Sequence, residues 1–192
     1  LITSISPFLL EKNYVDGVIC QKFTYDHDHP RAKAFIAQNF DDLIQSQGSK
    51  YCPTSVFDPI KHLIQIKHTS KRFCFIGLPC QILLLEKLIQ MDIISRSNVP
   101  YTIANFCGGF KDYRELISLI ERNGHNPKKV GHFQHRGDGQ PGFMRIKSDV
   151  KEIAVPYPSY GKGSLINKHR RCDLCIDGVG LLADFAIGDA WL

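Results

Sequence analysis

Along the first two thirds of the chain, the spacing of apolar residues changes repeatedly between the pattern typical of strands and the pattern typical of helices. Continuous or alternating apolar runs predict strands at residues 15–23, 32–37, 73–76 and 101–106. Apolar residues at helical spacing predict helices at residues 2–12, 41–47, 56–66, 81–90 and 111–123. Because strands and helices take turns, the pattern predicts an α/β fold with a mixed sheet and flanking helices.

Beyond Gly124 the pattern changes from helical spacing to strands and turns. Strands are predicted at residues 128–135 and 143–153 around a turn rich in Gly and Pro, followed by a loop at 157–164 and a last buried strand at 181–187. This last strand is expected to bring Asp184 and Asp189 near the loop that holds Cys172 and Cys175. The fold prediction therefore includes a β-rich C-terminal part that carries a Cys-x-x-Cys loop. With 192 residues and 43% apolar content, the chain suits one α/β domain over residues 1–192.

Charge and hydropathy narrow the classes of function. The net charge of +5 is spread evenly, with 11 Lys/Arg and 9 Asp/Glu in residues 1–96 and 13 and 10 in residues 97–192. This argues against a nucleic-acid interface, which usually concentrates basic residues on one face. No apolar run reaches the roughly 18 residues of a membrane span, and no signal peptide is recognisable. We expect a cytoplasmic protein whose seven cysteines serve metal or redox chemistry rather than disulfides.

Two cysteines follow predicted strands and precede predicted helices. Cys80 follows the strand at 73–76, and Cys107 follows the strand at 101–106. At the carboxyl end of a strand and the amino end of a helix, the helix dipole favours a thiolate, and ligands of open α/β sheets commonly bind there. We expect Cys80 and Cys107 to meet at one edge of the sheet, on neighbouring strands.

A second pair, Cys172 and Cys175, has the spacing of metal ligands on one small loop. With Cys80 and Cys107 it makes a set of four thiolates. Spacing alone leaves iron and zinc equally open, because four thiolates suit both. The remaining cysteines fit this pattern less well, and Cys74, inside a predicted core strand, is expected to be a small buried residue.

A third feature is the turn Gly48-Ser49-Lys50-Tyr51. It offers backbone donors, a hydroxyl, a cation and an aromatic ring, which suits a phosphate or a flavin, although such residues also make ordinary turns. Arg136, beside a turn with three glycines, can reach a phosphate or a cluster sulfur. These residues are candidate cofactor contacts.

Several of these motifs occur together in one known family. The chain resembles the beta-subunit family of coenzyme F420-reducing hydrogenases and dehydrogenases in Val15-Asp16-Gly17-Val18, Gly48-Ser49-Lys50-Tyr51, Gly77-Leu78-Pro79-Cys80-Gln81, Phe106-Cys107-Gly108-Gly109, Arg171-Cys172-Asp173-Leu174-Cys175-Ile176-Asp177 and Ala183-Asp184-Phe185-Ala186-Ile187-Gly188-Asp189. The order is the same, and the resemblance covers nearly the whole chain. It favours iron over zinc for the four cysteines.

The resemblance implies an iron–sulfur flavoprotein oxidoreductase. A [4Fe–4S] cluster on Cys80, Cys107, Cys172 and Cys175 would exchange electrons with FAD, and FAD would exchange hydride with a soluble carrier such as the 5-deazaflavin coenzyme F420. Flavin contacts are expected from Thr3, Ser49, Lys50, Tyr51 and Arg136. Lys50 would stabilise negative charge on the reduced ring. No catalytic acid or base is expected, since hydride exchange with a flavin depends on positioning.

The resemblance also has implications for the electron donor and for the length of the whole protein. The chain starts with Leu and lacks the amino-terminal ferredoxin module of many members, so we expect a fragment of a longer protein that receives electrons from a ferredoxin domain or partner subunit. Two alternatives remain: a zinc-binding module held by the four cysteines, and a scaffold subunit without catalysis.

Overall fold

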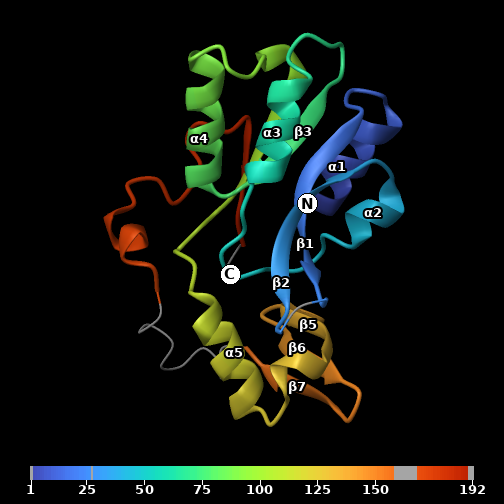
Figure 1. Ribbon diagram of the computed structural model, residues 1–192, viewed down its shortest axis with the longest axis vertical. Coiled ribbons are helices and arrows are strands. Elements are labelled where there is room, and N and C mark those ends of the chain that lie inside the picture. Colours follow the sequence, from blue (N-terminus) through green and yellow to red (C-terminus); the bar gives the residue numbers. More distant parts are fainter. Residues whose placement is uncertain (1, 27, 158–167, 190–192) are drawn as a thin grey trace.

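The computed structural model describes residues 2–26, 28–157 and 168–189. Its larger sheet has five strands in the order β2-β1-β3-β4-β8 (Figure 1). These strands are Gly17–Thr24 (β1), Arg31–Ala37 (β2), Phe73–Gly77 (β3), Tyr101–Asn105 (β4) and Phe185–Ile187 (β8). β1 and β2 are antiparallel, whereas β1, β3, β4 and β8 run parallel. The predicted α/β fold with a mixed sheet is confirmed.

Helices cover both faces of this sheet. The helices of the large sheet are Ile2–Glu11 (α1), Phe40–Ile44 (α2), Phe57–Gln65 (α3) and Pro79–Gln90 (α4). In β3, Phe75 packs with Leu63 of α3 and Leu85 of α4, whereas its neighbour Cys74 packs with Leu9 of α1 and Leu43 of α2. The strand is buried along its whole length because alternate side chains enter two separate cores.

A smaller antiparallel sheet, in the order β5-β6-β7, lies at the other end of the molecule (Figure 1). Its strands are Val130–Gly137 (β5), Phe143–Ser148 (β6) and Glu152–Pro156 (β7), and helix α5, Tyr113–Arg122, packs on it through Leu116, Leu119 and Ile120. The β1–β2 hairpin reaches this core, where the Tyr25 hydroxyl accepts from the Phe133 N–H at 3.0 Å. This contact joins the two sheets.

Short 3-10 helices complete the described structure at Arg96–Asn98 (η1), Pro127–Lys129 (η2) and Arg170–Leu174 (η4). None of the helices in the described part of the chain is both long and apolar enough to cross a membrane. Most of the loop predicted at 157–164 lies outside the described residues.

Two predicted strands differ in the structure. Residues 143–153 form two strands, because the Ser148 N–H donates to the Lys151 carbonyl at 3.0 Å and closes a turn between β6 and β7. The strand predicted at 181–187 pairs only at Phe185–Ile187, and it is an edge strand with Phe185 44% exposed rather than a buried one. The Asp177 carboxylate accepts from the N–H groups of Val179, Gly180 and Leu181, which holds the preceding residues in a turn.

Candidate functional site

The predicted strand–cysteine–helix units form as expected at the carboxyl edge of the large sheet. Cys80 is the second residue of α4, directly beyond β3, and Cys107 lies two residues beyond β4. β3 and β4 are parallel neighbours, with Gly77 opposite Ala104 at their carboxyl ends. The two cysteines therefore follow adjacent strands and lie at the same edge of the sheet.

Backbone contacts bring the C-terminal segment to this edge. The Cys107 N–H donates to the Gly178 carbonyl and the Phe106 N–H to the Ile187 carbonyl, both at 2.8 Å. Gly109 has a φ of +107°, and a Cβ on it would lie 3.1 Å from the Cys172 Cβ. Cys172 thus packs directly against the turn that follows Cys107, and this close approach requires glycine at position 109.

The four thiols affect one another electrostatically. Burial raises the pKa of Cys80, and the thiols of Cys107, Cys175 and Cys172 raise it further. Burial likewise raises the pKa of Cys107, with further contributions from Cys172 and Cys175. Like charges act in this way only over short distances, so the four sulfur atoms share one region of the molecule.

The donor set suits a soft metal or an iron–sulfur cluster, because it consists of sulfur atoms alone. Within residues 2–26, 28–157 and 168–189, however, no three Cys, His, Asp or Glu side chains stand at metal-ligand spacing. Ligation by Cys80, Cys107, Cys172 and Cys175 therefore stays a prediction.

Two polar groups that would stabilise negative charge lie beside Cys107. The Gly109 N–H donates to the Cys107 sulfur at 3.4 Å, and the Lys168 ammonium lowers the pKa of Cys107 by its charge. Lys168 forms an ion pair with Asp173 at 2.8 Å. Gly109 is part of a motif that carries the family resemblance, whereas Lys168 was not singled out from the sequence, because only the tertiary pairing of Lys168 with Lys111 places it here.

Two aspartates expected near the cysteines have other roles. The Asp184 carboxylate accepts from the Thr102 N–H at 2.7 Å and from the Thr102 hydroxyl at 2.8 Å, near the amino end of β4. Asp189 pairs with Arg136. The prediction that both lie at the cysteine site is therefore wrong for Asp184, because β8 runs parallel to β4 and Asp184 precedes it, at the amino end of the two strands.

The Gly48–Tyr51 turn follows α2 and faces the smaller sheet. The Lys50 ammonium donates to the carbonyls of Ser46 at 2.5 Å and of Gln47 and Gly48 at 2.9 Å. Burial lowers the pKa of Lys50 to about 8. An ammonium has three donors, and all three are used by the carbonyls of residues 46–48, so Lys50 stabilises the loop itself. Its predicted flavin contact stays a prediction.

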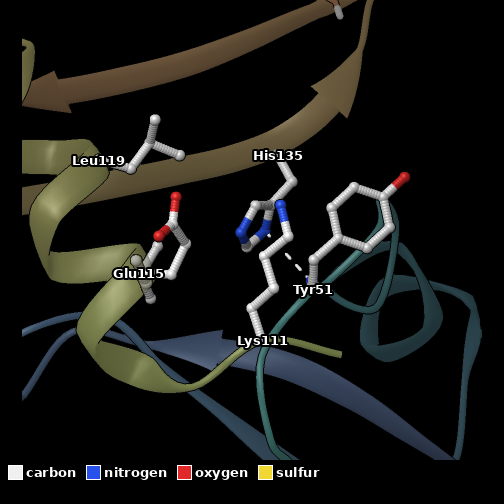
Figure 2. Close-up of a pocket in the computed structure, with 6 residues that line it drawn as sticks. Tyr51, Lys111, Glu115, Leu119 and His135 are labelled. Atoms are coloured by element: carbon white, nitrogen blue, oxygen red, sulfur yellow. Dashed lines mark hydrogen bonds between the residues drawn. The ribbon is translucent and has the colours of Figure 1, made fainter. Parts of the chain in front are cut away.

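Tyr51 contacts a histidine that sequence reasoning did not single out. The Tyr51 N–H donates to His135 Nδ1 at 3.4 Å, and the two ring centroids lie 5.1 Å apart (Figure 2). Burial lowers the pKa of His135 to about 3, which keeps the imidazole neutral. Its signal in the sequence is weak, because a histidine in an alternating strand pattern also occurs in ordinary sheets.

Beside His135 is a cavity of about 20 Å³ lined by Tyr51, Lys111, Glu115, Leu116, Leu119 and His135 (Figure 2). This is room for about one water molecule. A larger open groove of about 590 Å³ lies beside the turn, between the end of β1, residues 44–50 and β5. Ser49 and Lys50 line this groove together with the rings of Phe23, Tyr25 and Phe133, and its volume is in the range of small-molecule sites.

Arg136 ties the smaller sheet to the C-terminal segment. Its guanidinium donates to the Pro141 carbonyl at 2.7 Å and the Gln140 amide oxygen at 2.8 Å, and it pairs with Asp189. The guanidinium carbon lies 5.4 Å from the centre of the Tyr157 ring. Thr3 belongs to α1, but its side chain lies outside the described structure. Flavin contacts of Arg136, Thr3, Ser49 and Tyr51 remain predictions.

Sequence comparison finds relatives, two of which match nearly the whole chain. It is 23% identical to an uncharacterized protein of Methanocaldococcus jannaschii, over 98% of this chain and 51% of the relative. It is 24% identical to the chloroplastic 7-hydroxymethyl chlorophyll a reductase of Oryza sativa subsp. japonica, over 98% and 38%. It is 30% identical to the beta subunit of the F420-dependent formate dehydrogenase of M. jannaschii, over 62% and 30%. The chain thus spans about half or less of the length of these relatives.

The fold is also found in a solved structure. The xenon-derivatized F420-reducing [NiFe] hydrogenase complex of Methanosarcina barkeri contains a chain that matches with a TM-score of 0.69 at 20% identity, over 98% of this chain and 63% of that one.

Family models cover both parts of the chain. Residues 1–61 match the amino-terminal model of the coenzyme F420 hydrogenase/dehydrogenase beta subunit, and residues 70–191 match its carboxyl-terminal model. The second match alone spans more than half of the chain and includes all four edge cysteines. The protein therefore belongs to the coenzyme F420 hydrogenase/dehydrogenase beta-subunit family.

Proposed function

We propose that this chain is the catalytic unit of an oxidoreductase that binds a [4Fe–4S] cluster through Cys80, Cys107, Cys172 and Cys175 and FAD beside the Gly48–Tyr51 turn. The observation that supports it is the convergence of four thiols from three distant segments at the carboxyl edge of β3 and β4. When bound, these cofactors would supply one-electron transfer at the cluster and hydride transfer at the flavin.

The residues of the chain have defined tasks in this proposal. Four thiolates on a cluster carry a large negative charge, which the Gly109 N–H and the Lys168 ammonium would offset from the side of Cys107. Lys168 stays protonated because its ion pair with Asp173 raises its pKa. Tyr51 would offer a stacking face for the flavin, and the backbone bond to neutral His135 fixes the position of that residue.

The substrate and the electron donor are proposed from the sequence similarity to the relatives alone. One relative is named as an F420-dependent formate dehydrogenase subunit and another as a 7-hydroxymethyl chlorophyll a reductase. We propose a soluble hydride carrier, such as coenzyme F420, or another small molecule as the substrate. A ferredoxin domain or a partner subunit would supply or accept single electrons.

The first experiment is anaerobic reconstitution with iron and sulfide, followed by iron analysis and a visible spectrum. We expect about four iron atoms per chain and a broad absorption in the blue that dithionite bleaches. Cys175→Ser should lose this absorption, whereas Cys74→Ala, which removes a thiol from the core, should keep it.

Two outcomes would contradict the proposal. A purified protein that holds one zinc ion on the same four thiols and never takes up iron would support the zinc-module alternative. Equal iron content in wild type and Cys175→Ser would exclude this ligand set. For the flavin, Tyr51→Ala should weaken FAD binding measured by quenching of flavin fluorescence, and unchanged affinity would move the flavin site elsewhere.

A further inference from the structure

The amide side chain of Gln81 connects the two parts of the proposed site. Gln81 follows Cys80 as the third residue of α4, and it is partly buried. Its Oε1 accepts from the Leu78 N–H at 2.9 Å and from Gln21 Nε2 at 3.2 Å. Its Nε2 donates to the Thr54 carbonyl at 3.1 Å. One side chain thus joins the start of α4, the strand β1 and the segment that leads from the proposed flavin turn into α3.

The hydrogen-bond partners fix which way this amide points. A backbone N–H can only donate, so the atom that faces Leu78 is the amide oxygen. A backbone carbonyl can only accept, so the atom that faces Thr54 is the amide nitrogen. The two ends of the Gln81 side chain therefore make different contacts. Among side chains of the same length, glutamate can make only the first contact, and methionine lacks both the amide oxygen and the donor.

The oxygen end holds the turn that presents Cys80. A glutamine at the third position of a helix whose side chain accepts from the N-cap N–H is one half of a capping box, and Leu78 is the N-cap of α4. The fit is close, because a Cβ on Gly77 would lie 3.0 Å from the Gln81 Oε1. Cys80 lies between the two residues that this hydrogen bond joins.

The nitrogen end holds the segment that carries Tyr51. This segment is fixed from three elements. The Tyr51 N–H donates to His135 of β5 at 3.4 Å, and the Tyr113 hydroxyl of α5 donates to the Pro53 carbonyl at 2.8 Å. Gln81 of α4 makes the third contact, at the next residue. The first two come from the smaller sheet and its helix, whereas the third comes from the carboxyl edge of the large sheet.

We infer that Gln81 is a positioning residue, which holds the segment of Tyr51 at a fixed place relative to Cys80. The inference rests on the proposed function, in which Tyr51 contacts the flavin and Cys80 is a cluster ligand. Gln81 acts through these two neighbours, with its oxygen end on the side of Cys80 and its nitrogen end on the side of Tyr51. Reactions that depend on positioning are sensitive to displacements of about 1 Å.

The test separates the two ends of the side chain. Gln81→Glu keeps the acceptor for the Leu78 N–H but cannot donate to the Thr54 carbonyl at about pH 8, where a glutamate is ionised. Its Kd for FAD, measured by quenching of flavin fluorescence, should rise about tenfold, the effect of one lost hydrogen bond, while iron uptake stays at the wild-type level. Gln81→Met, which loses both ends, should reduce iron uptake as well.

Gln90→Glu is the matched control. It adds the same charge at the exposed carboxyl end of the same helix, and it should change the Kd for FAD less than about twofold. A second measurement needs no cofactor. In the cofactor-free protein, Gln81→Glu should speed hydrogen exchange in residues 51–56 and leave exchange in residues 78–82 unchanged, because only the contact to Thr54 is lost.

The outcomes distinguish this inference from the proposed function. Wild-type FAD affinity in Gln81→Glu contradicts the positioning role. A parallel loss of iron and FAD in Gln81→Glu also contradicts it, because the loss would then reflect a general disturbance of the fold. If the wild type takes up neither iron nor FAD, the proposed function is wrong, and the task assigned to Gln81 is wrong with it.

Discussion

The seven cysteines lie in two regions of the molecule, which place the same side chain in different environments. In the interior of the molecule, burial raises the pKa of Cys20 to about 11 and of Cys52 and Cys74 to about 12. At the carboxyl edge, Cys80 and Cys175 are exposed, and the remaining two are partly buried. The interior thiols stay protonated at neutral pH, whereas the edge thiols are accessible to a metal or an oxidant.

The difference comes from position relative to the strands. Cys74 is the second residue of β3, flanked by β1 and β4, so it has no route to solvent. Cys80 is only six positions later, but the strand ends between them and α4 begins. The accessibility of a thiol at this edge therefore depends on where the strands end, and the buried cores on both faces of the sheet hold those ends in place. Four pairs of variants test this division.

The largest effect on stability is expected at Phe75. This side chain is fully buried in the core under α3 and α4, so Phe75→Ala should lower the free energy of unfolding by about 3–5 kcal/mol. Leu174→Ala at the edge should change it by less than about 0.5 kcal/mol. Urea unfolding followed by circular dichroism measures both. Similar losses in the two variants would show that the edge segment is part of the folding core.

His135 should make the protein sensitive to acid. Its folded pKa of about 3 lies below the ordinary 6.5, so the unfolded chain binds a proton that the folded chain does not. Stability from this group is complete above about pH 6.5 and falls as the pH decreases toward 3, at about 1.4 kcal/mol per pH unit. Between pH 6 and 4, wild type should lose roughly 2–3 kcal/mol more than His135→Asn, whose amide oxygen can still accept from Tyr51.

The control for this prediction is His132→Asn, an exposed residue on the same strand. Other acid-sensitive groups, such as Asp16, are common to all three proteins and cancel in the difference. Parallel pH profiles for wild type and His135→Asn would mean that water reaches the imidazole and that the Tyr51 contact is open.

Cys74→Ser and Cys175→Ser exchange the same atoms in the two regions. The serine hydroxyl at position 74 would be buried among apolar side chains, which should cost about 1–3 kcal/mol of stability. At position 175 the stability of the iron-free protein should change by less than about 0.5 kcal/mol. Thermal unfolding without iron measures both, and a larger loss at position 175 would reverse the assignment of the two regions.

The smallest effect is expected at the turn after Cys107. Gly109→Ala places a methyl group against Lys168 and Cys172 at a positive φ, which should cost about 1–2 kcal/mol and reduce iron uptake. Gly108→Ala is its matched control, because a Cβ there meets no atom within 4 Å. Equal iron uptake by the two variants would show that Cys172 need not stay against this turn.

The sequence by itself determined the local units. The apolar run at 73–76, ended by Gly77 and followed by a leucine-rich stretch, predicts a buried strand and then a helix, so Cys80 falls at their junction. The same pattern places Cys107. Two such units in succession also predict neighbouring parallel strands, because connections are short and right-handed. These are consequences of periodicity, which acts over a few residues.

Only the tertiary structure decided which distant groups meet. The segment that holds the Cys172–Cys175 loop reaches the end of β4 because the Cys107 N–H donates to the Gly178 carbonyl and the Phe106 N–H to the Ile187 carbonyl. No local sequence pattern contains these pairings. The strand expected at 181–187 has only three residues. The Asp177 and Asp184 carboxylates accept from backbone N–H groups, of Gly180 and Thr102, that a longer strand pairing would use. Lys168 and His135 act through partners more than 50 residues away in sequence. The spacing of apolar residues indicates burial and local geometry. The candidate site depends instead on contacts between polar groups far apart in the sequence, and such contacts do not alter that spacing.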